Sequence, residues 1–282
     1  MKVLRQIFNN LPIRPIKQNW RCLSSLPVID VKVDKKGIAT LNMNKPPVNV
    51  LSTDMLLMLK SEIKELEKNK CRGLILTSAN KSVFSAGLDL KELYRPDEQR
   101  LREYYALFQE TWLAWYGAEM PTAALINGHA PAGGCVISTC CDYRVMLPNF
   151  TIGVNEVQFG VIIPIYVQAS VSSVLPKRIA EIALTQGKLY TSAEAYQVGF
   201  VDELADTKQQ GLDKCLKYLA AFEKVTPKAA TLTKLQFRAG DLEEFHRERK
   251  RDLDKFVKNV TDEETQQVIG EYVESLHNKQ KK

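Results

Sequence analysis

Residues 127–135 read Asn-Gly-His-Ala-Pro-Ala-Gly-Gly-Cys, a glycine-bearing loop that follows the apolar segment 122–126 and precedes a helical pattern. A similar loop, Phe-Ser-Ala-Gly-Leu-Asp-Leu at 84–90, comes after the apolar segment 73–78. Continuous apolar strands that lead through loops into helices are typical of an α/β core with functional groups on those loops. Small residues allow main-chain N–H groups to approach a carbonyl oxygen. The two loops therefore predict a site where backbone amides stabilise an oxyanion.

A single glutamate, Glu156, follows these loops within the segment 153–160, which reads Gly-Val-Asn-Glu-Val-Gln-Phe-Gly. A lone loop glutamate is usually a solvated charge, but this one comes after two loops that predict an oxyanion site. Apolar neighbours such as Val154 and Phe159 predict a raised pKa for Glu156 and the exclusion of water, which suits general acid/base catalysis. The sequence thus predicts an enzyme with one carboxylate beside its oxyanion donors.

The wider pattern predicts an α/β core followed by a helical region. A β-hairpin, two long helices and a short further strand are expected at 28–33 with 37–43, 52–68, 98–116 and 143–146. From about residue 191 the pattern is helical, with one helix predicted over 206–222. The charged segment 228–277 carries an intermittent apolar stripe, which suits packing on a neighbouring subunit or folding back over the core.

Composition places the 282-residue chain among soluble globular proteins, with 45% hydrophobic and 26% charged residues. Its apolar runs fall short of the roughly 20 residues that a membrane-spanning helix needs. The net charge is +6, but residues 1–29 hold five Lys and Arg and no acid, which leaves 6 − 5 = +1 elsewhere. The nearly neutral remainder disfavours nucleic-acid binding. The acid-free basic N-terminus predicts a mitochondrial transit peptide over 1–23 or, alternatively, a disordered basic tail.

Four motifs in order resemble those of the crotonase (enoyl-CoA hydratase/isomerase) superfamily. They are the loops at 84–90 and 126–135, Cys-Asp-Tyr-Arg at 141–144, and the glutamate segment at 153–160. The likeness spans about residues 28–275. It implies an α/β fold, a crotonase-like spiral of β-β-α turns with a helical C-terminal trimerisation region. The expected division is a core at 24–205 and a helical region at 206–282.

The resemblance also implies a role for individual residues. The catalytic set would be Glu156 as acid/base with the backbone amides of Ala86 and Gly133 as oxyanion donors. The acyl-CoA site would comprise Ala86, Gly87, Leu88, Asp89, Leu90, Gly133 and Asn155, the last of which would help position Glu156. Hydratases of this family place a second glutamate where this chain has Val136. Hydration needs two groups to hold and activate water, whereas moving a double bond needs one base, so Val136 favours isomerisation.

The implied function is conversion of cis- or trans-3-enoyl-CoA to trans-2-enoyl-CoA in the β-oxidation of unsaturated fatty acids. A hydratase or thioesterase in which Asp89 or Glu92 supplies the second acid is one alternative, and a non-catalytic acyl-CoA-binding scaffold is another. No separate cofactor is expected, because CoA is part of the substrate, and the three histidines show no metal-site spacing. The expected partners are an acyl-CoA thioester and two further copies of the chain in a homotrimer, with no nucleic acid or membrane span. The expected location is the mitochondrial matrix.

Overall fold

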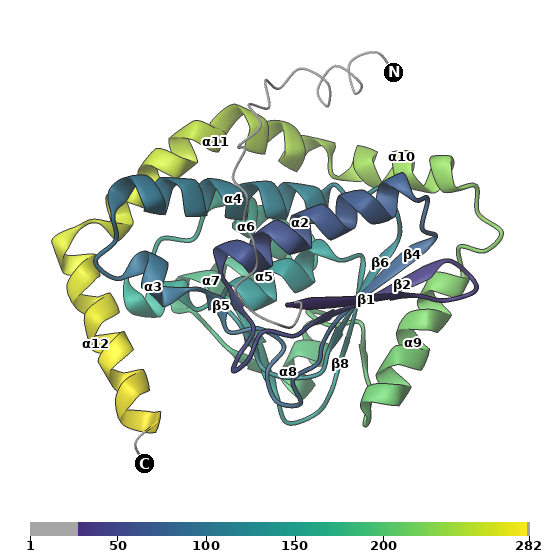
Figure 1. Ribbon diagram of the computed structural model, residues 1–282, viewed down its shortest axis with the longest axis horizontal. Coiled ribbons are helices and arrows are strands. Elements are labelled where there is room, and N and C mark those ends of the chain that lie inside the picture. The colour runs from purple at the N-terminus through teal and green to yellow at the C-terminus, as the bar shows by residue number, and fades with distance from the viewer. Residues whose placement is uncertain (1–27, 281–282) are drawn as a thin grey trace.

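The computed structural model describes residues 28–280 (Figure 1). The predicted transit peptide, 1–23, lies outside these residues. The main sheet has six strands in the order β1-β2-β4-β6-β8-β11. The strands are β1 (Ile29–Val33), β2 (Ile38–Met43), β4 (Gly73–Ser78), β6 (Thr122–Ile126), β8 (Tyr143–Met146) and β11 (Glu203–Leu204). Strands β1 and β2 form the predicted antiparallel hairpin, and the remaining neighbours pair in parallel.

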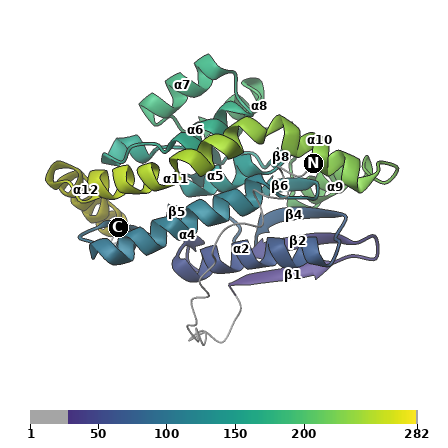
Figure 2. The same ribbon diagram turned by 90° about the horizontal axis from the view of Figure 1, so that it is seen from above.

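Helices cover one face of this sheet in two layers. Helix α2 (Thr53–Lys68) lies beside α4 (Glu98–Tyr116), and α11 (Ala239–Val260) crosses α4 farther out (Figures 1 and 2). Helices α5 (Gly133–Cys140) and α6 (Ile165–Ser172) complete the covering. The apolar stripe of α4 is fully buried at Trp112 and Trp115, which confirms its predicted role in core packing.

The opposite face of the sheet is covered by α9 (Lys208–Ala220). Its Cys215 and Leu219 pack on Ile75 and Leu125 in a second apolar cluster. A side chain at Gly211 would place its Cβ 2.3 Å from Leu125 Cδ1, so glycine allows the helix to approach the sheet. The predicted boundary at 205/206 thus falls between the last strand and a helix that covers the sheet, and the division into two regions stays a prediction.

Five two-residue or three-residue strands hold the loops around the site. Strand β3 (Val50–Leu51) pairs in parallel with β5 (Gly87–Leu88) inside the first glycine loop. A three-stranded sheet, β10-β9-β7, joins β10 (Tyr190–Thr191), β9 (Thr151–Gly153) and β7 (Ala130–Pro131). Strands this short carry no readable alternation of apolar and polar residues, so the sequence pattern did not identify them.

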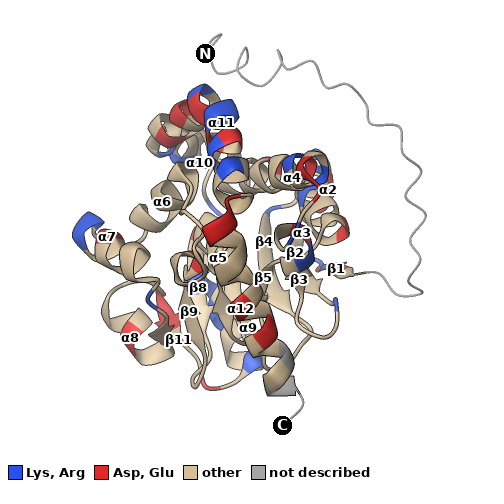
Figure 3. Ribbon diagram, turned by 90° about the vertical axis from the view of Figure 1, so that its left-hand side faces the viewer, with Lys and Arg blue, Asp and Glu red and all other residues tan. Residues whose placement is uncertain are grey.

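The C-terminal helices α11 and α12 (Glu263–Gln280) fold back over the chain's own core. Their buried side chains in the main apolar cluster are Phe245, Phe256, Val260 and Ile269. The sequence left open whether the tail packs on a neighbouring subunit or folds back over the core, and this part of it folds back over the core. The outer turns of α11 carry charges of both signs (Figure 3). Among the helices of residues 28–280, none is long and apolar enough to cross a membrane.

The remaining helices have between 4 and 11 residues. They are α3 (Leu90–Leu93), α7 (Lys177–Gln186), α8 (Ser192–Gln197), α10 (Pro227–Phe237) and the 3₁₀ turn η1 (Glu156–Phe159). Helices α6 and α7 follow Pro164 and Pro176, which stand at their N-caps. The sequence analysis identified no helix in this region, although proline is compatible with a helix start.

Candidate active site

The first glycine loop supplies one backbone donor, but not the predicted one. The N–H of Ala86 donates to the carbonyl oxygen of Val48 at 3.0 Å. It is therefore engaged within the protein, and the prediction that Ala86 is an oxyanion donor is corrected. The residue type gave no warning, because every residue except proline carries the same N–H group.

The backbone nitrogen of Leu88 lies beside the second loop. The Tyr104 hydroxyl accepts a hydrogen bond from the N–H of Asp89 at 2.9 Å and donates to the carbonyl oxygen of Leu51 at 2.6 Å. This bridge directs the Asp89 N–H toward β3. A Cβ built on Gly133 would lie 3.4 Å from the Leu88 nitrogen, which places the two amides side by side.

Gly133 is the first residue of α5, so its N–H has no acceptor within the helix. The positive end of the helix dipole adds to the pull on a negative oxygen at this point. Gly87 has φ +86°, and a Cβ there would lie 2.9 Å from the Gly133 nitrogen and 2.7 Å from Ala132 Cβ. Only glycine suits this conformation and this close approach. The two loops thus present the amides of Leu88 and Gly133 to one space.

Glu156 opens η1 and has Asn155 as its N-cap. The residue is 8% exposed, and its Oε2 has no hydrogen-bond partner among residues 28–280. Burial raises the pKa of the Glu156 carboxyl to about 7, with backbone amides of Glu156 and Asn155 opposing the rise. The expectation of a raised pKa is confirmed. A carboxyl with a pKa near neutrality exchanges protons readily in both directions, as acid/base catalysis requires.

The predicted positioning role of the Asn155 side chain is not visible as a hydrogen bond. Its Oδ1 is buried without a partner and makes no bond to Glu156. Two further buried polar atoms without partners, Trp112 Nε1 and Tyr166 Oη, belong to neighbouring aromatic rings 5.1 Å apart. Polar atoms of this kind are uncommon in protein interiors and mark places where a ligand or water supplies the partner.

The surroundings of Glu156 are formed by α5, α6 and α12. Burial is the largest cause that raises the pKa of the Cys135 thiol on α5 and of the Tyr272 hydroxyl on α12. The negative charge of Glu156 is the second largest cause for both groups. The Glu156 charge also raises the pKa of Tyr166 on α6, with burial and Asp252 contributing more. Val136 is 1% exposed in the first turn of α5. Position 136, where hydratases of the family have a glutamate, therefore holds a buried apolar side chain.

The two carboxylates considered as a second acid are both engaged elsewhere. Asp89 accepts the N–H of Lys91 at 3.1 Å and caps α3, the structural role that sequence also allowed. Glu92 is buried and receives two hydrogen bonds from Arg100, at 2.6 and 2.7 Å. A bidentate guanidinium pair fixes the orientation of a carboxylate. Neither group is placed to activate water with Glu156.

Other predicted residues have structural roles. Leu90 starts α3, and Arg144 of the Cys-Asp-Tyr-Arg motif is buried and pairs with Asp202 at 2.8 Å. Tyr104 and Tyr272 were missed as site residues. Their apolar-stripe spacing marks them as helix core positions, and nothing in sequence indicates that a hydroxyl meets the first loop. Within residues 28–280, no cluster of three or more His, Cys, Asp or Glu residues is placed to hold a metal ion.

Comparison with known proteins places these features in context. The sequence model of the family described as enoyl-CoA hydratase/isomerase matches residues 34–282. Enoyl-CoA delta isomerase 1, mitochondrial, of Rattus norvegicus is 34% identical over 100% of this chain and 97% of its own length. The Homo sapiens protein of that name is 35% identical, over 85% of this chain and 80% of its own length.

Solved structures agree with these relatives. The crystal structure of human mitochondrial delta3-delta2-enoyl-CoA isomerase superposes with a TM-score of 0.87 at 34% identity, covering 89% of this chain and 99% of that one. The enoyl-CoA hydratase of Bacillus halodurans has a TM-score of 0.78 at 22% identity, covering 86% and 99%. The second similarity shows the fold alone.

Proposed function

This chain belongs to the enoyl-CoA hydratase/isomerase family, and from that premise we propose that Glu156 alone carries the proton in its reaction. The protein is an enoyl-CoA isomerase, as its similarity over the full chain to the delta isomerases shows. Its substrate is an acyl-CoA thioester. The proposed reaction converts cis- or trans-3-enoyl-CoA to trans-2-enoyl-CoA, the conjugated isomer that enters β-oxidation.

The proposed mechanism follows from the geometry of the two loops and the carboxylate. Glu156 removes a proton from carbon 2, and the electron pair moves onto the thioester oxygen to give a dienolate. The amides of Leu88 and Gly133 donate to that oxygen as its charge develops, which lowers the barrier because the donors are already in place. The protonated Glu156 then gives its proton to carbon 4. The double bond between carbons 3 and 4 has become one between carbons 2 and 3.

The observation that carries the proposal is one buried carboxylate, Glu156, whose Oε2 has no hydrogen-bond partner among residues 28–280, in a chain with valine at position 136. Glu156 lacks a partner at Oε2, whereas Asp89 and Glu92 are bonded and position 136 is apolar. Hydration of a 2-enoyl-CoA needs a second group to hold the water. The arrangement therefore favours isomerase over hydratase, and a buried base disfavours a scaffold that binds acyl-CoA without turnover.

The test compares two substrates at equal concentration, a 3-enoyl-CoA and a trans-2-enoyl-CoA, by the absorbance of the conjugated thioester. The expected result is rapid appearance of absorbance from the first and little loss of absorbance from the second. Rapid hydration of the trans-2-enoyl-CoA would contradict the proposal. CoA binding with no turnover of either substrate would favour the scaffold.

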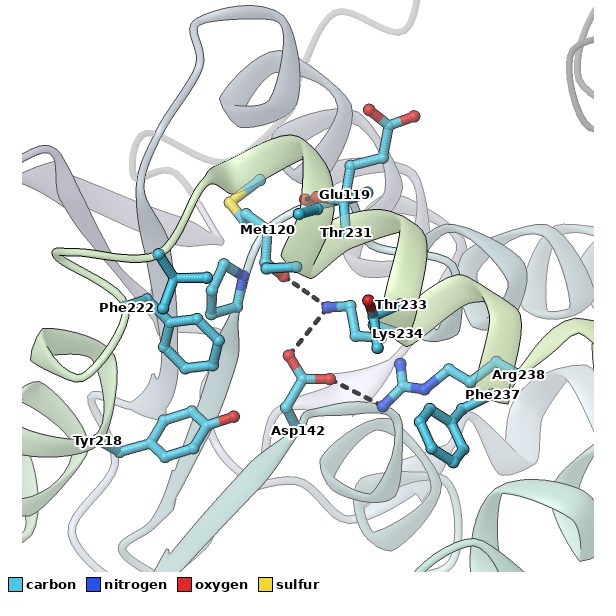
Figure 4. A pocket seen from close by; sticks show the side chains of 14 residues that line it. Glu119, Met120, Asp142, Tyr218, Phe222, Thr231, Thr233, Lys234, Phe237 and Arg238 are labelled. Carbon is cyan, nitrogen blue, oxygen red and sulfur yellow. Dashed lines mark hydrogen bonds and ion pairs between the residues drawn. The ribbon is translucent and has the colours of Figure 1, made fainter. Parts of the chain in front are cut away.

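We also propose a homotrimer in which α10 contacts a neighbouring copy. A groove between α9 and α10 is lined by Tyr218, Phe222 and Phe237, among others (Figure 4). Phe237 is 89% exposed on α10 and Leu232 is 41% exposed. Exposed apolar surface of this kind suits a protein interface, and the three-fold stoichiometry is what the family resemblance implies. Sedimentation is expected to give a trimer for the native protein and smaller species for Phe237→Asp, whereas an unchanged mass for Phe237→Asp argues against this surface.

The protein is mitochondrial, in line with the delta isomerase relatives. We propose the matrix as its compartment, because β-oxidation substrates are the class that the reaction handles. Import of the full chain into isolated mitochondria, followed by protease treatment before and after outer-membrane rupture, tests this location. Protection that persists after rupture is expected, and its loss would place the protein outside the matrix.

A further inference from the structure

The junction of α11 and α12 contacts the backbone that follows Glu156. The side-chain amide of Asn259, in the last turn of α11, accepts the N–H of Ile162 at 2.9 Å and donates to the carbonyl oxygen of Gly160 at 3.1 Å. Asn259 also donates to Thr265 Oγ1 at 3.3 Å, a contact that ties it to the start of α12. A single side chain therefore holds both a donor and an acceptor of the segment after η1.

The turn that carries Glu156 needs such support. It is one turn of 3₁₀ helix, a form with weaker hydrogen-bond geometry than an α-helix. Its closing backbone bonds include those of the Gln158, Gly160 and Val161 N–H groups to the carbonyl oxygens of Asn155, Val157 and Glu156, at 3.0, 3.3 and 3.1 Å. Phe159 stacks on Tyr272 of α12 with ring centroids 5.0 Å apart. The outer side of the turn thus rests on α11 and α12.

The same junction holds the segment that follows the first glycine loop. Gln266 of α12 donates to the carbonyl oxygen of Leu93 at 2.8 Å and accepts the N–H of Arg95 at 2.7 Å. Arg95 has φ +46°, a conformation that is unfavourable for arginine and requires its surroundings to hold it. Leu93 is the last residue of α3, whose first residue, Leu90, is also the last residue of the first glycine loop.

We propose that the α11–α12 junction is a clamp that fixes the distance between the carboxylate of Glu156 and the first glycine loop. Asn259 and Gln266 are its positioning residues. This inference rests on the proposed function, because it assigns the two clamped segments to the base and to the substrate. Asn259 acts on the turn of Glu156, and Gln266 acts on the segment after residues 87–90. Neither side chain is expected to touch the substrate.

Apolar packing alone would secure these helices. Phe245, Phe256, Val260 and Ile269 already bury them against the core. Besides contacts within the junction, to Thr265 Oγ1 and the Val260 carbonyl oxygen, Asn259 and Gln266 bond to main-chain groups on the two sides of the site. Small displacements of catalytic groups reduce rates strongly, by about 10²-fold for roughly 1 Å. Contacts that add little to burial can therefore matter for turnover.

The kinetic test uses Asn259→Ala and Gln266→Ala, with Gln267→Ala as the matched control. Gln267 is exposed on the same helix and bonds only to Glu271 among the described residues. Asn259→Ala is expected to lower kcat by roughly 10–100-fold with KM within about twofold. Gln266→Ala is expected chiefly to raise KM, and Gln267→Ala to change neither. Asn259→Asp keeps the acceptor for Ile162 but loses the donor to Gly160, so it serves if the alanine variant fails to fold and is expected to lower kcat as well.

A pH profile separates positioning from general loss of structure. The titratable groups near Glu156 on packed elements are Cys135, Tyr166 and Tyr272. A loosened turn admits water to Glu156, so the acidic limb of kcat/KM is expected to move to lower pH in Asn259→Ala. Values of kcat and of the acidic limb equal to those of the native protein in a folded Asn259→Ala or Asn259→Asp overturn the clamp.

Hydrogen exchange makes the test independent of activity. Amides in 156–163 are expected to exchange faster in Asn259→Ala, and amides in 93–96 faster in Gln266→Ala, with Gln267→Ala unchanged. Unchanged exchange in both variants overturns the clamp even if the enzyme proves to be an isomerase. If the native protein has no isomerase activity but the two variants still exchange faster than it does, the clamp stands and the proposed function is overturned. The two failures are therefore distinguishable.

Discussion

Replacement of Glu156 by glutamine is expected to stabilise the protein above neutral pH while it removes the base. Burial raises the pKa of the Glu156 carboxyl to about 7 from its ordinary value of 4.5. The folded protein therefore holds this proton more tightly than the unfolded chain does. Below pH 4.5 the carboxyl is protonated in both the folded and the unfolded state, so it does not lower the free energy of unfolding. As pH rises from 4.5 to 7 the unfolded chain releases its proton first, and the unfolding free energy falls.

The size of the effect follows from the two pKa values. The difference is 7 − 4.5 = 2.5, and each pH unit corresponds to about 1.4 kcal/mol, so the full effect above pH 7 is about 3 kcal/mol. Glutamine is neutral at every pH and similar in shape. Glu156→Gln should therefore match the native protein in stability near pH 4.5 and exceed it by up to about 3 kcal/mol at pH 8.

Urea unfolding at pH 5, 6, 7 and 8, at one protein concentration, measures this difference. Glu243→Gln, which changes an exposed glutamate on α11, is the matched control and should show no such trend. A constant difference between Glu156→Gln and the native protein across this range would refute the reasoning. A variant that is less stable than the native protein at pH 8 would show that Glu156 is ionised and well solvated in the fold.

Three further predictions concern the site and its support. Gly87→Ala places a Cβ 2.9 Å from the Gly133 nitrogen at φ +86°, so kcat should fall by at least about 10²-fold. The control Gly240→Ala, with open space around it, should retain full kcat. Equal kcat values for the two variants would contradict the paired amides. The value of kcat/KM should rise with pH and level off above about 7, because only ionised Glu156 accepts the carbon 2 proton; a flat profile from pH 5 to 8 would argue for another base. Asp142→Asn weakens the ion pairs with Lys234 and Arg238, at 2.9 and 2.8 Å, and should destabilise the fold by up to about 3–5 kcal/mol in urea unfolding, whereas a change below about 1 kcal/mol would mean that the buried cations find other partners.

Much of the core was predictable from sequence because its strands and helices are strongly patterned. The apolar segments 73–78 and 122–126 match β4 and β6 residue for residue, and the stripe at 98–116 matches α4. The loops that follow those strands were placed by their glycines. In each case a local signal, continuous apolarity or a residue with special backbone freedom, agrees with the tertiary structure.

The site was harder to predict where it depends on main-chain direction. Sequence placed one oxyanion donor in the loop 84–90 but assigned it to Ala86, whose N–H faces Val48. Which backbone N–H faces the site, that of Ala86 or that of Leu88, depends on how the two-residue strand β5 pairs with β3. The identities of the side chains do not indicate this pairing. The clamp contacts of Asn259 and Gln266 join segments about 100 and 170 residues apart, and a single sequence carries no signal of such pairing.

The most direct test of the account is the isomerase rate of Glu156→Gln with a 3-enoyl-CoA, measured together with its affinity for the substrate. We expect kcat to fall by at least about 10³-fold, because loss of the acid/base removes both proton transfers. Affinity for the acyl-CoA should stay within a few-fold, because the Leu88 and Gly133 amides remain in place. A variant that keeps a rate within tenfold of the native protein would contradict the claim that Glu156 carries the proton.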